Sequence, residues 1–478
     1  MPHTHTPAPE LLLQLLQRFI KHSNQTKQIH SLLITNGHLL LNSHTSPRFK
    51  WMNTLLYNTL IRAYLNFGQP YRTILLFPHM LAHQAPPNSH TFPSLIKAAS
   101  SSPSLASLIG KPLHTHVIKR GVSNDPFVQT CFVVLYAGQA DLKHARIMFD
   151  EISEPCIVSN NAMLDAFGKN GDMGSAVLLF ERMRVRDVLS WTSIINGYGR
   201  SGCFKEAIGF FEKMMMHEDV MGGFVKPNEA TFVCLLSSCA NLDGGRAIYQ
   251  GKEVHGYMIK NEIELTVFMG TALIAFYGKM GCLGYGMGVF NNMVVKEVCT
   301  WNAVISSLAL NGGEKQALGM FEKMKAGGWR PNEITFVAVL AACARAKLLE
   351  LGLGLFKSMS CVFKVVPRME HYGCVVDLLG RAGLLREANE FVRRMPFEPD
   401  ASVLGALLGA CRVHGSIELA NEVGRRLLGM QPRHCGRYVL LSSIYADAQE
   451  WDHAAALRRA MLNAKIQKIP AYSMIDLM

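Results

Sequence analysis

A Phe-x-x-Met phrase returns along this chain at a nearly fixed interval. Its copies are Phe77/Met80, Phe180/Met183, Phe211/Met214, Phe290/Met293, Phe321/Met324 and Phe356/Met359, with weaker copies at Phe149/Ile152 and Val392/Met395. Neighbouring copies lie 31, 31, 31, 35 and 36 residues apart, and the two larger gaps, 72 and 79, are each about twice that. A period in this range predicts a stack of helical repeats. Such a stack offers an extended binding surface rather than one enclosed catalytic pocket.

Each repeat is predicted to contain two helices. Apolar residues with helical spacing mark the first helix of one unit at Trp191, Ile194, Ile195 and Tyr198, and the second at Ala207, Phe210, Phe211 and Met214. Gly202 is expected to end the first helix, because glycine adopts the left-handed cap conformation without strain. A hairpin of this kind buries only one side, and the next hairpin covers the other. The Phe-x-x-Met residues are therefore expected in the core, and the predicted fold is all-α.

Composition agrees with an array that binds a polyanion. The 478 residues correspond to about eleven units of roughly 35 residues plus ends. The formal charge is +12, which attracts nucleic acid or an acidic membrane surface, although charge also serves solubility. No long Lys/Arg run is present, and this spread of charge suits a strand lying along a groove. No stretch is apolar enough to predict a membrane span.

The cysteines and three histidines are predicted to be structural. Twelve cysteines occur without a C-x-x-C motif, so neither a zinc ribbon nor a redox dithiol is indicated. Cys343 and Cys411 lie in apolar stretches and are expected as core residues in a reducing compartment. His30, His114 and His255 occupy the same place in three related phrases. We interpret them as hydrogen-bonding residues rather than ligands, and no metal or other cofactor is expected.

The aromatic residues at the start of the first helices provide a register. Asn58, Thr192 and Asn302 follow these aromatics, and the equivalent residues elsewhere are Pro93, Thr130, Asn161, Val233, Thr271, Val337 and Gly373. From Asn161 onward the steps are 31, 41, 38, 31, 35 and 36 residues. The unequal steps predict units of mixed length. The longest step contains residues 216–222, which we interpret as a surface loop insertion.

Together these phrases resemble the plant pentatricopeptide repeat family, in its subgroup with alternating long and short repeats. The resemblance rests on the segments at 57–64, 298–305 and 328–336, on the final short repeat at 369–383, and on an E-type extension at 404–415 and 438–445. It implies a right-handed α-solenoid of stacked helix-turn-helix repeats. Residues 1–53 would be an N-terminal segment with a transit peptide and a degenerate repeat, and residues 401–478 the E-type extension. The repeats would be 54–88, 89–125, 126–156, 157–187, 188–228, 229–266, 267–297, 298–332, 333–368 and 369–400.

The same resemblance implies that each repeat reads one base of single-stranded RNA through two side chains. The pairs would be Asn58 with Asn88, Thr130 with Cys156, Asn161 with Asp187, Thr192 with Asn228, Thr271 with Glu297, and Asn302 with Asn332. By resemblance, Asn161/Asp187 suggests uracil, Thr192/Asn228 suggests adenine, and the two Asn/Asn pairs suggest pyrimidines. Cys156 and Glu297 depart from the usual partners. The alternative for every Asn and Thr here is a helix N-cap.

No catalytic motif accompanies the array. The zinc deaminase domain that follows the E-type region in some relatives needs His-x-Glu and Cys-x-x-Cys, and neither occurs. The resemblance therefore implies a non-enzymatic factor that specifies C-to-U editing sites in organellar RNA and recruits a separate DYW-type deaminase and accessory proteins. The amphipathic residues 10–20 are compatible with an organelle transit peptide or with the first helix of the array. We expect a mitochondrial location, with the chloroplast as the alternative.

Two other functions remain open at this stage. An RNA-binding array of this type could act in splicing or RNA stability without editing. A helical scaffold that binds proteins, as tetratricopeptide arrays do, predicts uniform spacing near 34 residues. The alternation of 31, 35 and 36 residues argues against that scaffold.

Overall fold

A computed structural model describes residues 8–39, 47–217, 224–242 and 245–468 of the chain. The chain forms two compact units, residues 1–235 and 236–478, with the boundary inside helix α13 (Glu229–Asn241). The described residues contain 26 α-helices and no β-strand, so the predicted all-α solenoid class is confirmed. The predicted loop insertion at 216–222 lies, from residue 218 onward, outside the described residues.

The helices preceding α13 belong to the first unit. They are α1 (Pro9–Arg18), α2 (Ser23–Thr35), α3 (Pro47–Asn66), α4 (Pro70–Ala82), α5 (Thr91–Ala99), α6 (Pro103–Lys119), α7 (Pro126–Gly138), α8 (Leu142–Asp150), α9 (Ile157–Lys169), α10 (Met173–Arg182), α11 (Val188–Arg200) and α12 (Phe204–Met216).

The helices following α13 belong to the second unit. They are α14 (Arg246–Lys260), α15 (Val267–Lys279), α16 (Leu283–Asn292), α17 (Val298–Leu310), α18 (Glu314–Ala326), α19 (Glu333–Arg345), α20 (Leu349–Cys361), α21 (Met369–Arg381), α22 (Leu385–Arg393), α23 (Ala401–His414), α24 (Ile417–Met430), α25 (Cys435–Asp447) and α26 (Trp451–Asn463).

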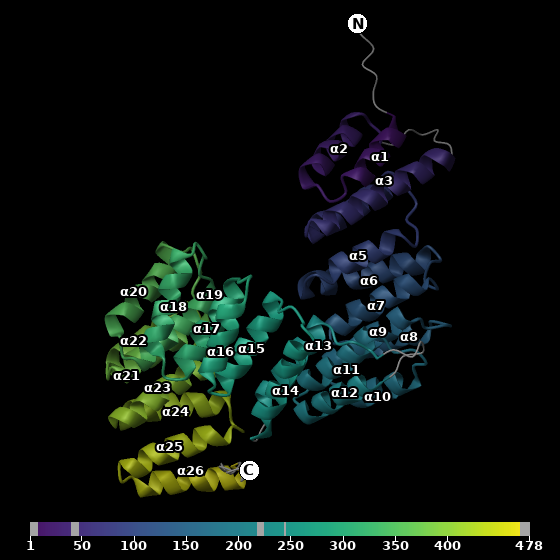
Figure 1. Ribbon diagram of the computed structural model, residues 1–478. Helices are drawn as coiled ribbons and strands as arrows, with labels where there is room; N and C mark the ends of the chain where they lie inside the picture. The colour runs from purple at the N-terminus through teal and green to yellow at the C-terminus, as the bar shows by residue number, and fades with distance from the viewer. Residues whose placement is uncertain (1–7, 40–46, 218–223, 243–244, 469–478) are drawn as a thin grey trace. The chain divides into compact units, whose positions relative to one another are not determined.

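Within each unit the helices pair into hairpins that stack one on the next (Figure 1). Odd-numbered helices are the first helices of the hairpins, and even-numbered helices are the second helices. In the first unit α5, α7, α9 and α11 contact one another in order, and in the second unit α15, α17, α19, α21 and α23 do the same. Each first helix therefore packs on the first helix of the neighbouring repeat, and equivalent positions recur along one row.

The Phe-x-x-Met residues lie in the core, as predicted. All six methionines of the full copies are buried, and so are Phe77, Phe180, Phe290 and Phe321. Phe211 and Phe356 are partly buried and pack against the same cores. The predicted core cysteines Cys343 and Cys411 are also fully buried. The repeated phrase thus sets the spacing of the stack.

Most turns between a first and a second helix contain a residue with positive φ. Glycine occupies this position at Gly68, Gly171, Gly202, Gly281, Gly312, Gly383 and Gly415, which confirms the predicted role of Gly202. Three turns place another residue there, namely Ala140, Lys347 and Gln449. An L-residue in this conformation is strained by about 1–2 kcal/mol. These three positions therefore keep a side chain against a local conformational preference.

The three equivalent histidines form the hydrogen bonds predicted for them. His30, His114 and His255 each contact a tyrosine of a neighbouring first helix through Nδ1, at 2.9 Å to Tyr64, 2.7 Å to Tyr136 and 2.8 Å to Tyr277. Burial lowers the pKa of all three histidines. Each pair thus joins adjacent hairpins through neutral groups.

The amphipathic N-terminal stretch forms α1. Its residues Leu12, Leu13 and Leu16 are buried, and the helix contacts α2 and α3. Of the two interpretations left open by the sequence, the packing corresponds to a helix of the stack. Among the described residues, no helix has both the length and the apolar character required to cross a bilayer.

Candidate nucleic-acid interface

Five of the six first residues of the predicted pairs occupy one register of their helices; the sixth, Asn58, lies further along the longer helix α3. Thr130, Asn161, Thr192, Thr271 and Asn302 are the fifth residues of α7, α9, α11, α15 and α17. An N-cap precedes the first helical residue, so these side chains do not cap their own helices. The N-cap alternative therefore fails for these five residues. Because the first helices stack in order, their fifth residues form a row along each unit.

The second residue of a pair precedes the next first helix and lies beside the first residue. Asn161 Nδ2 donates to Asp187 Oδ1 at 3.0 Å, and the same bond joins Asn58 to Asn88 at 3.1 Å and Asn302 to Asn332 at 3.0 Å. The structure therefore brings together three of the six predicted pairs by direct hydrogen bonds, although their residues are 26 or 30 positions apart.

A hydroxyl three residues after the cap completes each of these sites. Ser190 Oγ lies 2.7 Å from Asn161 Oδ1 and 2.9 Å from Asp187 Oδ1. Thr91 does the same for Asn58 and Asn88, and Thr335 for Asn302 and Asn332. We call each set a junction triad: the first residue of a pair, the second residue, which lies just before or at the start of the next first helix, and this hydroxyl residue. In each triad the amide nitrogen of the first residue donates to the second residue, and the hydroxyl lies within bonding distance of an oxygen of both.

The pairs with threonine are joined through the hydroxyl residue. Thr192 Oγ1 lies 2.7 Å from Thr231 Oγ1, which donates to Asn228 Oδ1 at 2.9 Å. Thr271 Oγ1 lies 3.1 Å from Thr300 Oγ1. Thr300 in turn accepts from the Glu297 N–H at 3.3 Å. Thr192/Asn228/Thr231 and Thr271/Glu297/Thr300 are thus triads of a second kind.

The remaining predicted pair is not joined. Thr130 Oγ1 donates to the carbonyl of Pro126 in its own helix at 2.7 Å. Cys156 is exposed and is contacted instead by Ser159, whose hydroxyl donates to the Cys156 carbonyl at 2.9 Å. In the described part of the chain no hydrogen bond connects Thr130 with Cys156. Cys156, which the sequence marked as an unusual partner, thus belongs to a junction whose two pair residues are not hydrogen-bonded; we call it an open junction.

Three of the second residues, Asp187, Asn228 and Asn332, are N-caps as well as pair members. Asp187 Oδ1 accepts from the Ser190 N–H at 2.8 Å, and Asn332 and Asn228 accept from the Thr335 and Thr231 N–H groups. Partial burial raises the pKa of Asp187, but hydrogen bonds from Ser190 and Asn161 outweigh it, so the pKa is lowered overall. Asp187 is therefore ionised at neutral pH and only accepts hydrogen bonds. Its bonds to Asn161 and Ser190 all end on Oδ1, which leaves Oδ2 as an acceptor for a ligand.

Replacing Thr335 with valine is expected to destabilise the second unit by about 1–3 kcal/mol. Thr335 is fully buried, and its hydroxyl lies 2.6 Å from Oδ1 of the buried Asn302. Valine has the same shape but leaves that oxygen without a donor, which carries the full desolvation penalty. Urea denaturation measures the change. Thr115, whose exposed hydroxyl bonds only its own helix, is the matched position, and Thr115→Val should change stability little. Equal midpoints for the two variants would contradict the triad.

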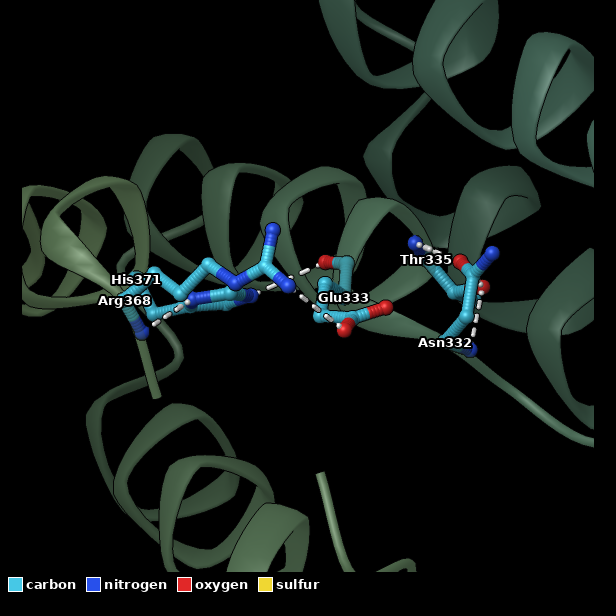
Figure 2. A network of polar contacts seen from close by, with 5 residues as sticks. All are labelled: Asn332, Glu333, Thr335, Arg368 and His371. Atoms are coloured by element: carbon cyan, nitrogen blue, oxygen red, sulfur yellow. Dashed lines mark hydrogen bonds and ion pairs between the residues drawn. The ribbon is translucent and has the colours of Figure 1, made fainter. Parts of the chain in front are cut away.

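The junction between α19 and α21 contains different residue types from the triads (Figure 2). The fifth residue of α19 is the apolar Val337, the cap position is Arg368, and His371 replaces the hydroxyl residue. His371 is buried; its Nε2 lies 2.9 Å from the Glu333 carbonyl, and its Nδ1 accepts from the Arg368 N–H at 2.9 Å. Arg368 Nη2 and Glu333 Oε1 form an ion pair at 3.1 Å. This junction is held together without offering a polar fifth residue.

Prediction from the sequence missed the hydroxyl residues of the triads. Thr91, Ser190, Thr231, Thr300 and Thr335 are buried at or near the junctions and contact both helices. A signal for them was present, because Asp187 and Ser190 have the spacing of a capping box. The crossing contact of His371 has no comparable signal, because it ends on a backbone carbonyl.

Comparison with known protein families gives three descriptions along the chain. The PPR repeat matches residues 161–188, 189–218, 334–361 and 370–398, the PPR repeat family matches 296–345, and the E motif matches 414–476.

Relatives and solved structures agree with these matches. A pentatricopeptide repeat-containing protein of Arabidopsis thaliana is 51% identical over 463 residues, covering 97% of this chain and 96% of its own length. Another from the same plant, named as chloroplastic, is 40% identical over 424 residues, covering 89% and 75%. The maize protein PPR10, solved in complex with an 18-nt psaJ RNA element, is similar over 98% of this chain and 71% of its own, with a TM-score of 0.53 and 18% identity. At that identity the likeness concerns the fold alone.

Proposed function

Because the chain belongs to the pentatricopeptide repeat family, we propose that it binds single-stranded RNA in a plant organelle and reads bases through its junction triads. The observation that carries this proposal is the geometry of Asn161/Asp187/Ser190. The triad holds two side chains 3.0 Å apart and leaves specific donors and acceptors unused. RNA-reading modules use such side chains on the edges of unstacked bases.

The Asn161/Asp187 triad offers one donor and one acceptor. Asn161 uses one amide hydrogen for Asp187 and keeps the other, while the ionised Asp187 keeps Oδ2. Uracil presents the complementary pattern, because its N3–H donates and its O4 accepts. A base with an acceptor at this edge would face Oδ2 of Asp187, which is also an acceptor, so no hydrogen bond could form there. Uracil is therefore the base proposed for this triad.

The Thr192/Asn228 triad offers its groups in the reverse order. Asn228 Oδ1 is occupied by Thr231, so the amide nitrogen of Asn228 is left to donate. Thr192 Oγ1 lies 2.7 Å from both the Val188 carbonyl and Thr231 Oγ1, and the two lone pairs of a hydroxyl oxygen leave it acceptor capacity. Adenine presents an acceptor at N1 and a donor at N6, which suits this pattern. Thr192 and Asn228 therefore favour adenine.

The Asn/Asn triads offer donors only. The oxygen of Asn332 accepts from Asn302 and lies within bonding distance of the Thr335 hydroxyl, so both hydrogens of its amide nitrogen are unused. Asn58 and Asn88 are arranged alike. Cytosine presents acceptors at both N3 and O2, whereas uracil presents a donor at N3. The Asn/Asn triads therefore favour cytosine within the pyrimidines.

The finer proposal is a specificity factor for C-to-U RNA editing. The match of residues 414–476 to the E motif supports it, together with the proposed division into repeats at 54–400 and an extension at 401–478. Deamination would be carried out by a separate DYW-type enzyme, so this chain would bind rather than catalyse. RNA splicing or stability is the alternative within the same binding class. The mitochondrion is the proposed location and the chloroplast the alternative, which a fluorescent fusion distinguishes.

Binding to short RNAs tests the base-reading proposal. RNAs carrying uracil and adenine at the adjacent positions addressed by Asn161/Asp187 and Thr192/Asn228 should bind most tightly. Each wrong base should weaken binding by about 1–3 kcal/mol. Fluorescence anisotropy at fixed salt measures this, because non-specific binding is strongly salt-dependent. Equal affinity for all sequences would refute base reading, and binding of proteins but not RNA would favour the scaffold alternative.

A further inference from the structure

A pocket lies between two first helices, on the face of each helix that carries its fifth residue. In α21 the fifth residue is Gly373, and Asp377 and Arg381 follow at intervals of four; in α23 the fifth residue is Gly405, followed by Gly409 and Val413. Residues four apart share one face of a helix. A cavity of about 350 Å³ is lined by residues of both faces together with neighbouring residues: Lys347, Asp377, Gly380, Arg381, Ala406, Gly409, Ala410, Val413 and His414. The pocket therefore lies on the same face of these helices as their fifth residues, four to eight residues further along each helix.

The floor of this pocket is apolar and closely packed. Gly380 allows α21 to approach α23, because a Cβ at that position would lie 2.5 Å from the Ala410 Cβ. His414 Nε2 contacts the Gly380 carbonyl at 2.9 Å. In contrast, a Cβ at Gly409 would meet no atom within 4 Å. The floor is thus closely packed at Gly380 and open above Gly409.

The rim carries more positive than negative charge. Arg381 Nε and Asp377 Oδ2 form an ion pair at 2.8 Å, which leaves the terminal nitrogens of Arg381 to contact a ligand. Lys347 is exposed, and no ion pair involves it among the described residues. With Asp377 paired to Arg381, the Lys347 ammonium gives the rim a net positive charge. An apolar floor with a cationic rim suits a nucleotide, because the face of its base is apolar and its phosphate is charged.

Lys347 occupies its place against a conformational preference. It has φ +55° in the turn between α19 and α20, where seven equivalent turns use glycine. Backbone strain of this kind is often retained at functional sites. Here it places an ammonium group at the rim of the pocket.

We propose that this pocket holds one nucleotide of the bound RNA outside the junction triads, without selecting its base. The proposal rests on the proposed RNA-binding function. The base would lie on the floor formed by Ala406, Gly409 and Ala410, and the phosphate would lie near Lys347 and Arg381. A base that packs by its face against apolar groups, with no contact to its edge, is bound with little sequence preference.

The variant Lys347→Gly tests the phosphate contact without endangering the fold. Glycine removes the charge and relieves the positive φ, so thermal stability should be unchanged or higher. Lys364→Gly is the matched control, because Lys364 also has positive φ (58°) and an exposed side chain but does not line the pocket. Two kinds of RNA are compared by anisotropy: one that spans only the triads, and one lengthened by a few nucleotides at either end.

Lys347→Gly should bind an RNA lengthened at one end roughly three- to tenfold more weakly, and lower the salt slope by about 0.7, which corresponds to one single-strand phosphate. Its affinity for the short RNA should be unchanged, and Lys364→Gly should match the wild-type chain on both. Wild-type affinity of Lys347→Gly for every lengthened RNA would overturn the proposal, as would equal weakening on short and long RNAs. Failure of the wild-type chain to bind RNA would refute the proposed function itself.

Filling the pocket tests the base contact independently. Gly409→Leu adds a side chain into open space and raises helix propensity in α23, so folding should be retained. It should abolish the gain in affinity from lengthening the RNA, whereas Gly354→Leu in α20, which also meets open space, should not. A lengthening segment without bases should bind the wild-type chain and Gly409→Leu equally. If Gly409→Leu keeps the full gain, no base lies on this floor.

Discussion

Replacing Asp187 with asparagine should change the base preferred at that position from uracil to cytosine. The variant exchanges the acceptor Oδ2 of Asp187 for an amide donor, which opposes the N3–H of uracil and pairs with N3 of cytosine. One hydrogen bond is lost and another gained, and each unpaired buried group carries about 1–3 kcal/mol. The difference between the free energies of binding uracil and cytosine should therefore change by about 2–4 kcal/mol.

The fold should tolerate this change, because asparagine caps helices as well as aspartate does. The reciprocal variant Asn332→Asp is the matched control, since it converts an Asn/Asn triad into an Asn/Asp triad and should shift preference from cytosine to uracil. Competition binding with RNAs that differ at one base measures both shifts. The lowered pKa of Asp187 keeps the carboxylate ionised at mildly acidic pH, so the uracil preference of the wild-type chain should persist there. A variant with the preference of the wild-type chain would contradict the assignment of Asp187.

Replacing Gly251 with valine should destabilise the second unit by about 3 kcal/mol or more. A Cβ at position 251 in α14 would lie 1.9 Å from Cζ of Phe276, a fully buried ring in α15. The ring has little room to move, because protein interiors are close-packed and overpacking forces side chains from their rotamers. Urea denaturation followed by circular dichroism measures the loss.

Gly256 in the same helix provides the comparison. A Cβ there meets no atom within 4 Å, so Gly256→Ala should be neutral or stabilise the helix by up to about 1 kcal/mol. Loss of stability in both variants would point to a general intolerance of α14 rather than to the contact with Phe276. A similar midpoint for Gly251→Val and the wild-type chain would show that α14 can shift away from α15.

The sequence predicted the repeat and its register because both are periodic. Buried Phe and Met residues impose the spacing, the residues that begin the first helices give the register of Asn161 and Asn302, and the resemblance to the family singles these positions out. Their partners Asp187 and Asn332 each lie five positions before the next fifth residue, and the direct contacts at 3.0 Å agree with that register. The role of these pairs in reading RNA stays a prediction.

Other features depend on three-dimensional approach and left no periodic signal. Lysine rarely adopts positive φ, so Lys347 could not be placed in a strained turn from its neighbours. The pocket near Gly409 arises from the close approach of α21 and α23 at Gly380, which no spacing reveals. The open junction at Thr130 and Cys156 was indicated only by an unusual partner, and the contact that replaces it involves Ser159.

The cap residues have two roles, and this limits how a chain of this kind can acquire a new RNA target. A residue such as Asp187 both caps a helix and faces the proposed base. The residue types allowed at this position are therefore the good N-caps, chiefly Asn, Asp, Ser and Thr. Exchanges among these residue types, such as Asn for Asp, change the hydrogen-bond donors and acceptors while leaving the helix intact. Retargeting can therefore proceed one junction at a time with little penalty in folding, whereas Cys156 and Glu297 lie outside this set of good N-caps.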